Sequence, residues 1–78
     1  MADEQIAALN QITAMIDEKA TLYKNSLRSM PPARAAAEKQ LILKLIDDGL
    51  SLARSIKPAP FSLIQDLEQL TRELSRLG

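Results

Sequence analysis

Carboxylates are the candidate side chains in this sequence for general acid–base chemistry or for ligating a metal ion. The chain has no histidine, cysteine or tryptophan, which removes the usual general bases, thiol nucleophiles and nitrogen or sulfur metal ligands. Two adjacent carboxylate pairs occur, Asp17-Glu18 and Asp47-Asp48. Adjacent residues point about 100° apart on a helix, so neither pair converges on one point. We interpret both pairs as solvated helix surface and expect no catalytic, metal or cofactor site; a divalent cation on Asp17 or Asp48 is the open alternative.

Glycine is rare in this sequence. Only Gly49 and Gly78 occur, so the sequence has no glycine-rich loop that could bind phosphate. A glycine inside a helix costs roughly 0.5–1 kcal/mol relative to alanine. Because Gly49 falls on an apolar stretch of helical periodicity, we expect a neighbouring helix backbone to approach it closely, near Thr13.

Four prolines divide the chain into three helical segments. These prolines are Pro31, Pro32, Pro58 and Pro60. Proline ends helices and biases the preceding residue away from helical geometry. The predicted helices span about residues 3–29, 32–57 and 62–77. Short connections make sequential helices antiparallel neighbours. We therefore predict an all-α fold in one domain, residues 1–78: a three-helix antiparallel up-down-up bundle, made of a long helical hairpin and a shorter third helix.

Each segment repeats apolar residues at helical spacing. The stripe on the first consists of Leu9, Thr13, Ile16, Ala20, Tyr23 and Leu27. The second has an apolar face of about 200°, which needs two neighbours and predicts the central helix. The third carries leucines in a 4-3-4-3 rhythm typical of coiled-coil packing. Asp3 and Ser62 are the predicted N-caps, and Ser62 with Gln65 has the spacing of a capping box.

Opposite charges cancel over the whole chain but are separated along it. Ten Lys and Arg residues balance ten Asp and Glu residues. This zero net charge argues against a general nucleic-acid or membrane-surface binder. Residues 1–18 carry only acids, whereas residues 19–44 carry six Lys or Arg residues against Glu38 alone. The basic zone is centred on the connection between the first two helices.

Unequal helix lengths predict an uncovered tip in this basic zone. The first two helices are about 25 residues long, near 38 Å, and the third about 16 residues, near 24 Å. The end of the hairpin would therefore extend beyond the third helix and expose apolar side chains, which often mark an interaction site. The predicted partner-binding residues are Tyr23, Lys24, Leu27, Arg28, Met30 and Arg34. A second stripe with heptad spacing is a candidate face for self-association and consists of Ala8, Met15 and Leu22.

These features predict a small non-enzymatic helical module that binds another protein or itself, as an adaptor, a chaperone-like protein or a regulatory or inhibitory protein. The first residues lack the positive and apolar regions of a secretory signal, and no apolar stretch is long enough to span a bilayer. We therefore expect a cytoplasmic protein with no membrane contact. The alternative from another class is a nucleic-acid-associated regulator that uses the basic tip, whose binding would weaken steeply with added salt.

The outline of amphipathic helices resembles two groups of small bacterial proteins, the helical immunity proteins of bacteriocin producers and the helical chaperones of secretion systems. The first resemblance implies a bacteriocin-immunity-like function as a further alternative. Immunity bundles generally have a fourth helix, which this sequence lacks. The resemblance therefore covers the outline alone, and no residue roles are carried over.

Overall fold

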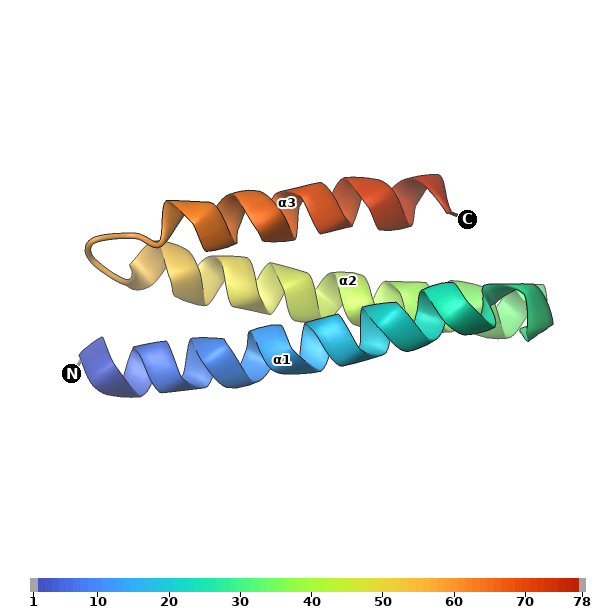
Figure 1. Ribbon diagram of the computed structural model, residues 1–78, viewed down its shortest axis with the longest axis horizontal. Helices are drawn as coiled ribbons and strands as arrows, with labels where there is room; N and C mark the ends of the chain where they lie inside the picture. The colour runs from blue at the N-terminus through green and yellow to red at the C-terminus, as the bar shows by residue number, and fades with distance from the viewer. Residues whose placement is uncertain (1, 78) are drawn as a thin grey trace.

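The computed structural model describes residues 2–77 and has the three-helix antiparallel up-down-up arrangement that the sequence predicts (Figure 1). The helices are α1 (Ala2–Ser26), which continues into a 3-10 helix (Leu27–Ser29), α2 (Pro32–Ser55) and α3 (Phe61–Arg76). α2 packs against both α1 and α3, as expected for the central helix. The bundle measures 43 × 19 × 16 Å.

A short polar cap and two prolines reverse the chain between α1 and α2. Ser29 Oγ and the Met30 N–H both donate hydrogen bonds to the Ser26 carbonyl, at 3.2 and 3.1 Å. These bonds satisfy a carbonyl at the end of α1 and tighten its last turn. Pro31 is extended (φ −59°, ψ 148°), and Pro32 occupies the first position of α2, where a missing N–H leaves no helical bond unmade.

Neither of the two predicted N-cap residues, Asp3 and Ser62, occupies an N-cap position in the structure. α1 begins one residue before Asp3, so this carboxylate lies inside the first turn, where it still favours the positive end of the helix dipole. α3 begins at Phe61 with Pro60 as its N-cap, so the expected capping box of Ser62 and Gln65 does not form. Proline already has a fixed φ close to the helical value. The helix therefore starts directly after Pro60, without a side-chain cap.

The core lies along the inner sides of all three helices. Its fully buried large side chains are Ile16, Ile42, Ile46 and Leu74. Ala20, Tyr23 and Leu67 complete this main cluster, and a smaller cluster near the α2–α3 connection contains Leu9, Ala53 and Ile56. Four members of the predicted α1 stripe are buried, namely Leu9, Ile16, Ala20 and Tyr23. Thr13, and Leu27 at the C-terminal end of the stripe, are half-buried.

Gly49 makes room for side chains from both neighbouring helices. A Cβ at this position would lie 3.3 Å from Cγ2 of Ile12 and 3.5 Å from Cδ1 of both Ile16 and Leu67. These nearest atoms belong to side chains, so the expected approach of the α1 backbone near Thr13 is corrected. The glycine allows branched residues of α1 and α3 to meet over α2.

We expect Gly49→Leu to lower the free energy of unfolding by about 1–3 kcal/mol, because the new side chain enters filled space and this outweighs the gain in helix propensity. Urea unfolding followed by circular dichroism measures the change. Gly49→Ala is the matched control. Its gain in helix propensity, up to about 1 kcal/mol, is opposed by the one tight contact that the added Cβ makes. A more stable Gly49→Leu variant would show that the space beside Gly49 is open.

Candidate functional site

The tip of the α1–α2 hairpin extends beyond the end of α3 (Figure 1). Two grooves open at this tip, and both are lined by Tyr23 and Met30. The first groove, about 480 Å³, is lined by Lys19, Leu22, Tyr23, Ser26, Ser29, Met30, Arg34 and Glu38. The second groove, about 390 Å³, is lined by Tyr23, Leu27, Met30, Pro32, Ala35, Ala36, Lys39 and Gln40.

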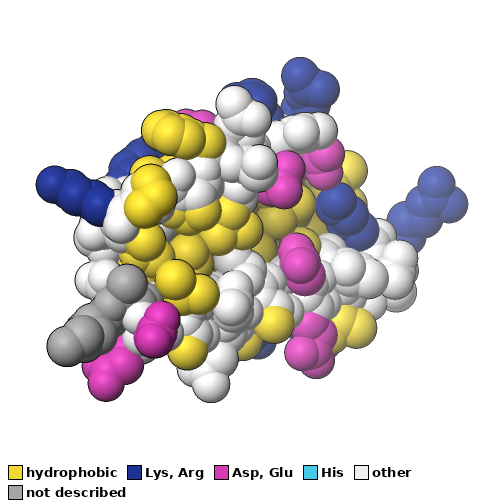
Figure 2. All heavy atoms as spheres, turned by 60° about the vertical axis from the view of Figure 1, so that its left-hand side comes forward, with side chains coloured by type: hydrophobic (Ala, Val, Ile, Leu, Met, Phe, Trp, Pro, Cys, Tyr) yellow, Lys and Arg dark blue, Asp and Glu magenta, His cyan; other side chains and the backbone are white. Residues whose placement is uncertain are grey.

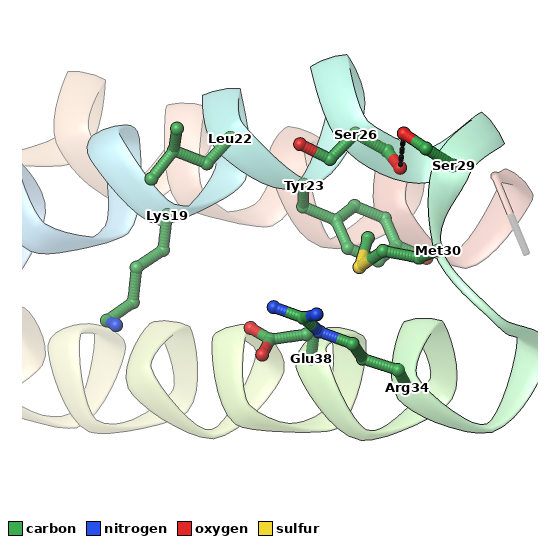
Figure 3. A pocket seen from close by; sticks show the side chains of 8 residues that line it. All are labelled: Lys19, Leu22, Tyr23, Ser26, Ser29, Met30, Arg34 and Glu38. Atoms are coloured by element: carbon green, nitrogen blue, oxygen red, sulfur yellow. Dashed lines mark hydrogen bonds between the residues drawn. The ribbon is translucent and has the colours of Figure 1, made fainter.

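The first groove combines an apolar floor with a charged rim (Figure 3). The side chains of Tyr23 and Met30 lie next to each other between the two helices, and Lys19 extends from α1 toward α2. Arg34 and Glu38 lie one turn apart along α2, on the opposite side of the opening. The rim therefore carries two cations and one acid above apolar side chains.

The second groove has fewer charged residues in its lining than the first. Lys39 is the only charged residue that lines it. Leu27, Met30 and Ala35 are half-buried, so part of each remains open to a ligand. This groove can accept apolar side chains beside a single positive charge.

Tyr23 is not the exposed anchor that the sequence predicted. Its side chain is 3% exposed and belongs to the main core cluster, together with Ile42 and Leu74. Tyr23 lies on the same helical stripe as the buried Leu9, Ile16 and Ala20, and α3 reaches far enough to bury this position, where Leu74 belongs to the same cluster. Tyr23 therefore supports the groove floor and presents little surface of its own.

The other predicted tip residues differ in how accessible they are. Leu27 and Met30 are half-buried and line the grooves, while Lys24, Arg28 and Arg34 are exposed. Of these three cations, Arg34 alone lines a groove. The structure also adds Lys19 and Lys39 to the rims, two cations that the sequence placed in the basic zone without assigning them a role.

Lys24 forms an ion pair within the chain. Its Nζ donates a hydrogen bond to Oε2 of Glu73 at 3.0 Å and so links α1 to α3. This hydrogen bond, and then the positive charge of Lys24, lower the pKa of the Glu73 carboxyl below its ordinary value. Through this ion pair, Lys24 of α1 contacts the last turns of α3.

We expect Lys24→Gln to raise the pKa of Glu73 back toward its ordinary value, as measured by NMR titration of the side-chain carboxyl. Because this pKa is lower in the folded than in the unfolded chain, the pair contributes stability above the unfolded pKa. That contribution is lost as the pH falls through the folded pKa. Both side chains are over 40% exposed, so added salt should weaken the effect. Lys44→Gln is the control, and equal Glu73 titrations in both variants would contradict the pairing.

The predicted self-association stripe lies on the outer side of α1. Met15 is 45% exposed and Leu22 58%, while Ala8 is half-buried. Leu41 of α2 is also exposed, at 46%. The structure therefore leaves Met15 and Leu22 of this stripe exposed, and Leu22 also lines the first groove.

Sequence reasoning missed an apolar surface at the opposite end of the bundle. Phe61, at the start of α3, is 73% exposed, and Ile6 in α1 is 45% exposed. Figure 2 shows hydrophobic side chains gathered at this end, between α1 and α3. The available signal was an aromatic residue directly after two prolines and outside the leucine rhythm of α3. Burial of such a residue depends on the path of the α2–α3 connection, which periodicity does not predict.

No family model, curated protein or solved structure matches the chain. Within residues 2–77, no helix combines the length and apolar character needed to cross a bilayer. The same residues contain no cluster of three or more His, Cys, Asp or Glu side chains placed to hold a metal ion.

Proposed function

We propose that this chain is a small non-enzymatic helical module, cytoplasmic in location, that binds an acidic segment of another protein at the tip of the α1–α2 hairpin. The observation that carries the proposal is the pair of grooves at the end that α3 leaves uncovered. The grooves share an apolar floor and are flanked by cations. In such a module, binding would serve an adaptor, chaperone-like or inhibitory role.

Charge at the rims favours an acidic partner. Lys19, Arg34 and Lys39 line the two grooves, against the single acid Glu38. Cations at an exposed rim accelerate association with an acidic partner and select against basic ones. The rim charges therefore determine which class of segment is attracted.

The groove floor favours apolar anchors within that segment. Met30 lines both grooves, and methionine adapts its shape to different apolar groups. Each groove has a volume at the lower end of the range seen for ligand pockets, enough to take individual side chains. An amphipathic acidic segment could place apolar side chains in both grooves at once.

Nucleic acid fits the same surface less well. Binding of single strands generally uses exposed aromatic rings on which bases stack. Tyr23, the aromatic residue nearest the basic rim, is 3% exposed. The tip thus offers cations without a stacking platform.

Selection from a displayed library of random peptides tests the proposal. We expect the immobilised chain to enrich peptides that combine Asp or Glu with apolar residues at helical spacing. The double variant Arg34→Glu, Lys39→Glu should weaken their binding at least about tenfold. The matched control is Lys44→Glu with Arg72→Glu, which reverses two exposed charges outside both grooves and should bind like the wild type.

Two results would contradict the proposal. One is enrichment of peptides without acidic residues, or of peptides that bind the tip variant as tightly as the control. The other is retardation of mixed DNA or RNA at low salt that disappears steeply as salt is added, which would favour the nucleic-acid alternative.

A further inference from the structure

We propose that the surface between α1 and α3 binds a basic amphipathic helix of a partner protein. This α1–α3 face consists of Ile6, Thr13 and Asp17 of α1 and Leu63, Asp66 and Leu70 of α3. None of these residues lines a tip groove. The inference goes beyond the binding of an acidic segment at the tip and does not depend on it.

The ion pair between α1 and α3 shows which sides of these two helices face each other. Nζ of Lys24 lies 3.0 Å from Oε2 of Glu73, so both residues occupy facing edges. The two helices run in the same direction, because each is antiparallel to α2 (Figure 1). Ile6 precedes Lys24 by 18 residues, about five helical turns, and therefore points to the same side of α1.

Two acids occupy the corresponding positions seven residues earlier in both helices. Asp17 precedes Lys24 by seven residues, and Asp66 precedes Glu73 by seven residues. Seven residues are about two helical turns, so Asp17 and Asp66 have nearly the same relation across the α1–α3 face as the ion pair has. Both acids are exposed, and neither belongs to an ion pair formed within residues 2–77. The face therefore presents two carboxylates from facing edges without a cation of the described chain paired to them.

Other charges keep this end of the bundle acidic. Asp3 is exposed and lies three residues before Ile6, as its neighbour on the surface of α1. Lys57, in the connection that precedes α3, supplies one exposed cation against Asp3, Asp17 and Asp66. A Lys or Arg side chain placed between Asp17 and Asp66 would form charge-assisted hydrogen bonds, whereas an acidic segment would be repelled. Charge complementarity therefore favours a basic partner.

Apolar side chains lie beside these acids. Ile6 is 45% exposed, while Leu63 and Leu70 are half-buried and pack against the main core cluster. Each of these leucines lies three residues before an acid, Asp66 or Glu73, and so is its neighbour on α3. Figure 2 shows hydrophobic side chains between α1 and α3, with acidic side chains on both helices beside them. An amphipathic helix can place its apolar stripe on this surface and its cations on the acids.

Two helical peptides of opposite charge test the inference. The probe is an amphipathic peptide of about 18 residues, about 27 Å long, with Leu on one side and Lys on the other. We expect fluorescence anisotropy to show that the double variant Asp17→Asn, Asp66→Asn binds it at least about tenfold more weakly than the wild type. The matched control is Asp47→Asn with Asp48→Asn, which removes two exposed acids of α2 and should bind like the wild type.

The second peptide, with Glu in place of Lys, separates this inference from the proposed function. Its binding at the tip should be lost in the Arg34→Glu, Lys39→Glu variant and should be kept when Asp17 and Asp66 are replaced. The Lys peptide should show the reverse pattern. Failure of one peptide to bind therefore contradicts one proposal and leaves the other standing.

Ile6→Ser tests the apolar part of the face. Met15→Ser is its matched control, because Ile6 and Met15 are equally exposed, at 45%, and lie about 180° apart around α1. Both positions are on the surface, so both variants should keep the fold. We expect only Ile6→Ser to weaken binding of the Lys peptide. A wild type that does not bind this peptide, or equal binding by the face variants and their controls, would overturn the inference.

Discussion

Replacing Leu74 by alanine is expected to unfold most of the chain at room temperature. Leu74 is fully buried and joins α3 to the core of Ile42 and Ile46. Truncating a buried leucine to alanine typically costs about 2–5 kcal/mol. The chain has no cysteine, and the core of a domain of this size without disulfides rarely supplies more than roughly 3–5 kcal/mol in total. Far-UV circular dichroism and urea unfolding should therefore show loss of most helical signal.

Leu77→Ala is the matched control because it makes the same substitution three residues further along. Leu77 is 40% exposed and follows the last residue of α3. We expect its removal to change stability by less than about 1 kcal/mol. Equal stabilities for the two variants would mean that α3 does not pack against the hairpin as described.

Tyr23→Ala is expected to be at least as damaging, with a loss of about 3–5 kcal/mol in the free energy of unfolding. The ring is 3% exposed and lies in the main core cluster, so its removal leaves a cavity between the three helices. Tyr23→Phe should stay within about 1 kcal/mol of the wild type, because it keeps the ring and removes one hydroxyl. Urea unfolding of both variants makes the comparison.

A stable, folded Tyr23→Ala variant would contradict this burial and would show that the Tyr23 side chain lies at the surface. If the expected loss is found, Tyr23 cannot be used to measure binding at the tip, since its substitution disrupts the fold first. Variants of Arg34 and Lys39 are the suitable probes, because both residues belong to the groove rims.

Helical periodicity was sufficient to predict the fold class. The spacing of Leu9, Ile16 and Ala20 follows the helical repeat, and these residues are buried as expected. The broad apolar face of α2 likewise predicted contacts on two sides, which the structure contains. These features follow from local sequence because burial of one face repeats with every turn of a helix.

Helix starts and the tip were less predictable. Pro60 competes with Ser62 for the start of α3, and a fixed backbone angle prevails over a side-chain hydrogen bond. Burial of Tyr23 depends on how far α3 reaches along the hairpin. The contact between Lys24 and Glu73, which are 49 residues apart, depends on the same length. Such long-range register is not encoded in any one stretch of sequence.

The grooves are also a tertiary property. The basic zone was visible as a run of cations, but the sequence did not show which of them face a cavity. Lys19 and Lys39 line the grooves, whereas Lys24 is paired within the chain. The packing of α2 and α3 against α1 separates these roles.

Chemical-shift mapping with a selected acidic peptide tests the central proposal most directly. The isotope-labelled chain is titrated with the peptide, and backbone amide shifts are followed in two-dimensional NMR spectra. The proposed function predicts that the largest shifts fall within residues 19–40, at the two grooves, and disappear in the Arg34→Glu, Lys39→Glu variant. Largest shifts around Phe61 and Ile6, at the opposite end of the bundle, would contradict it.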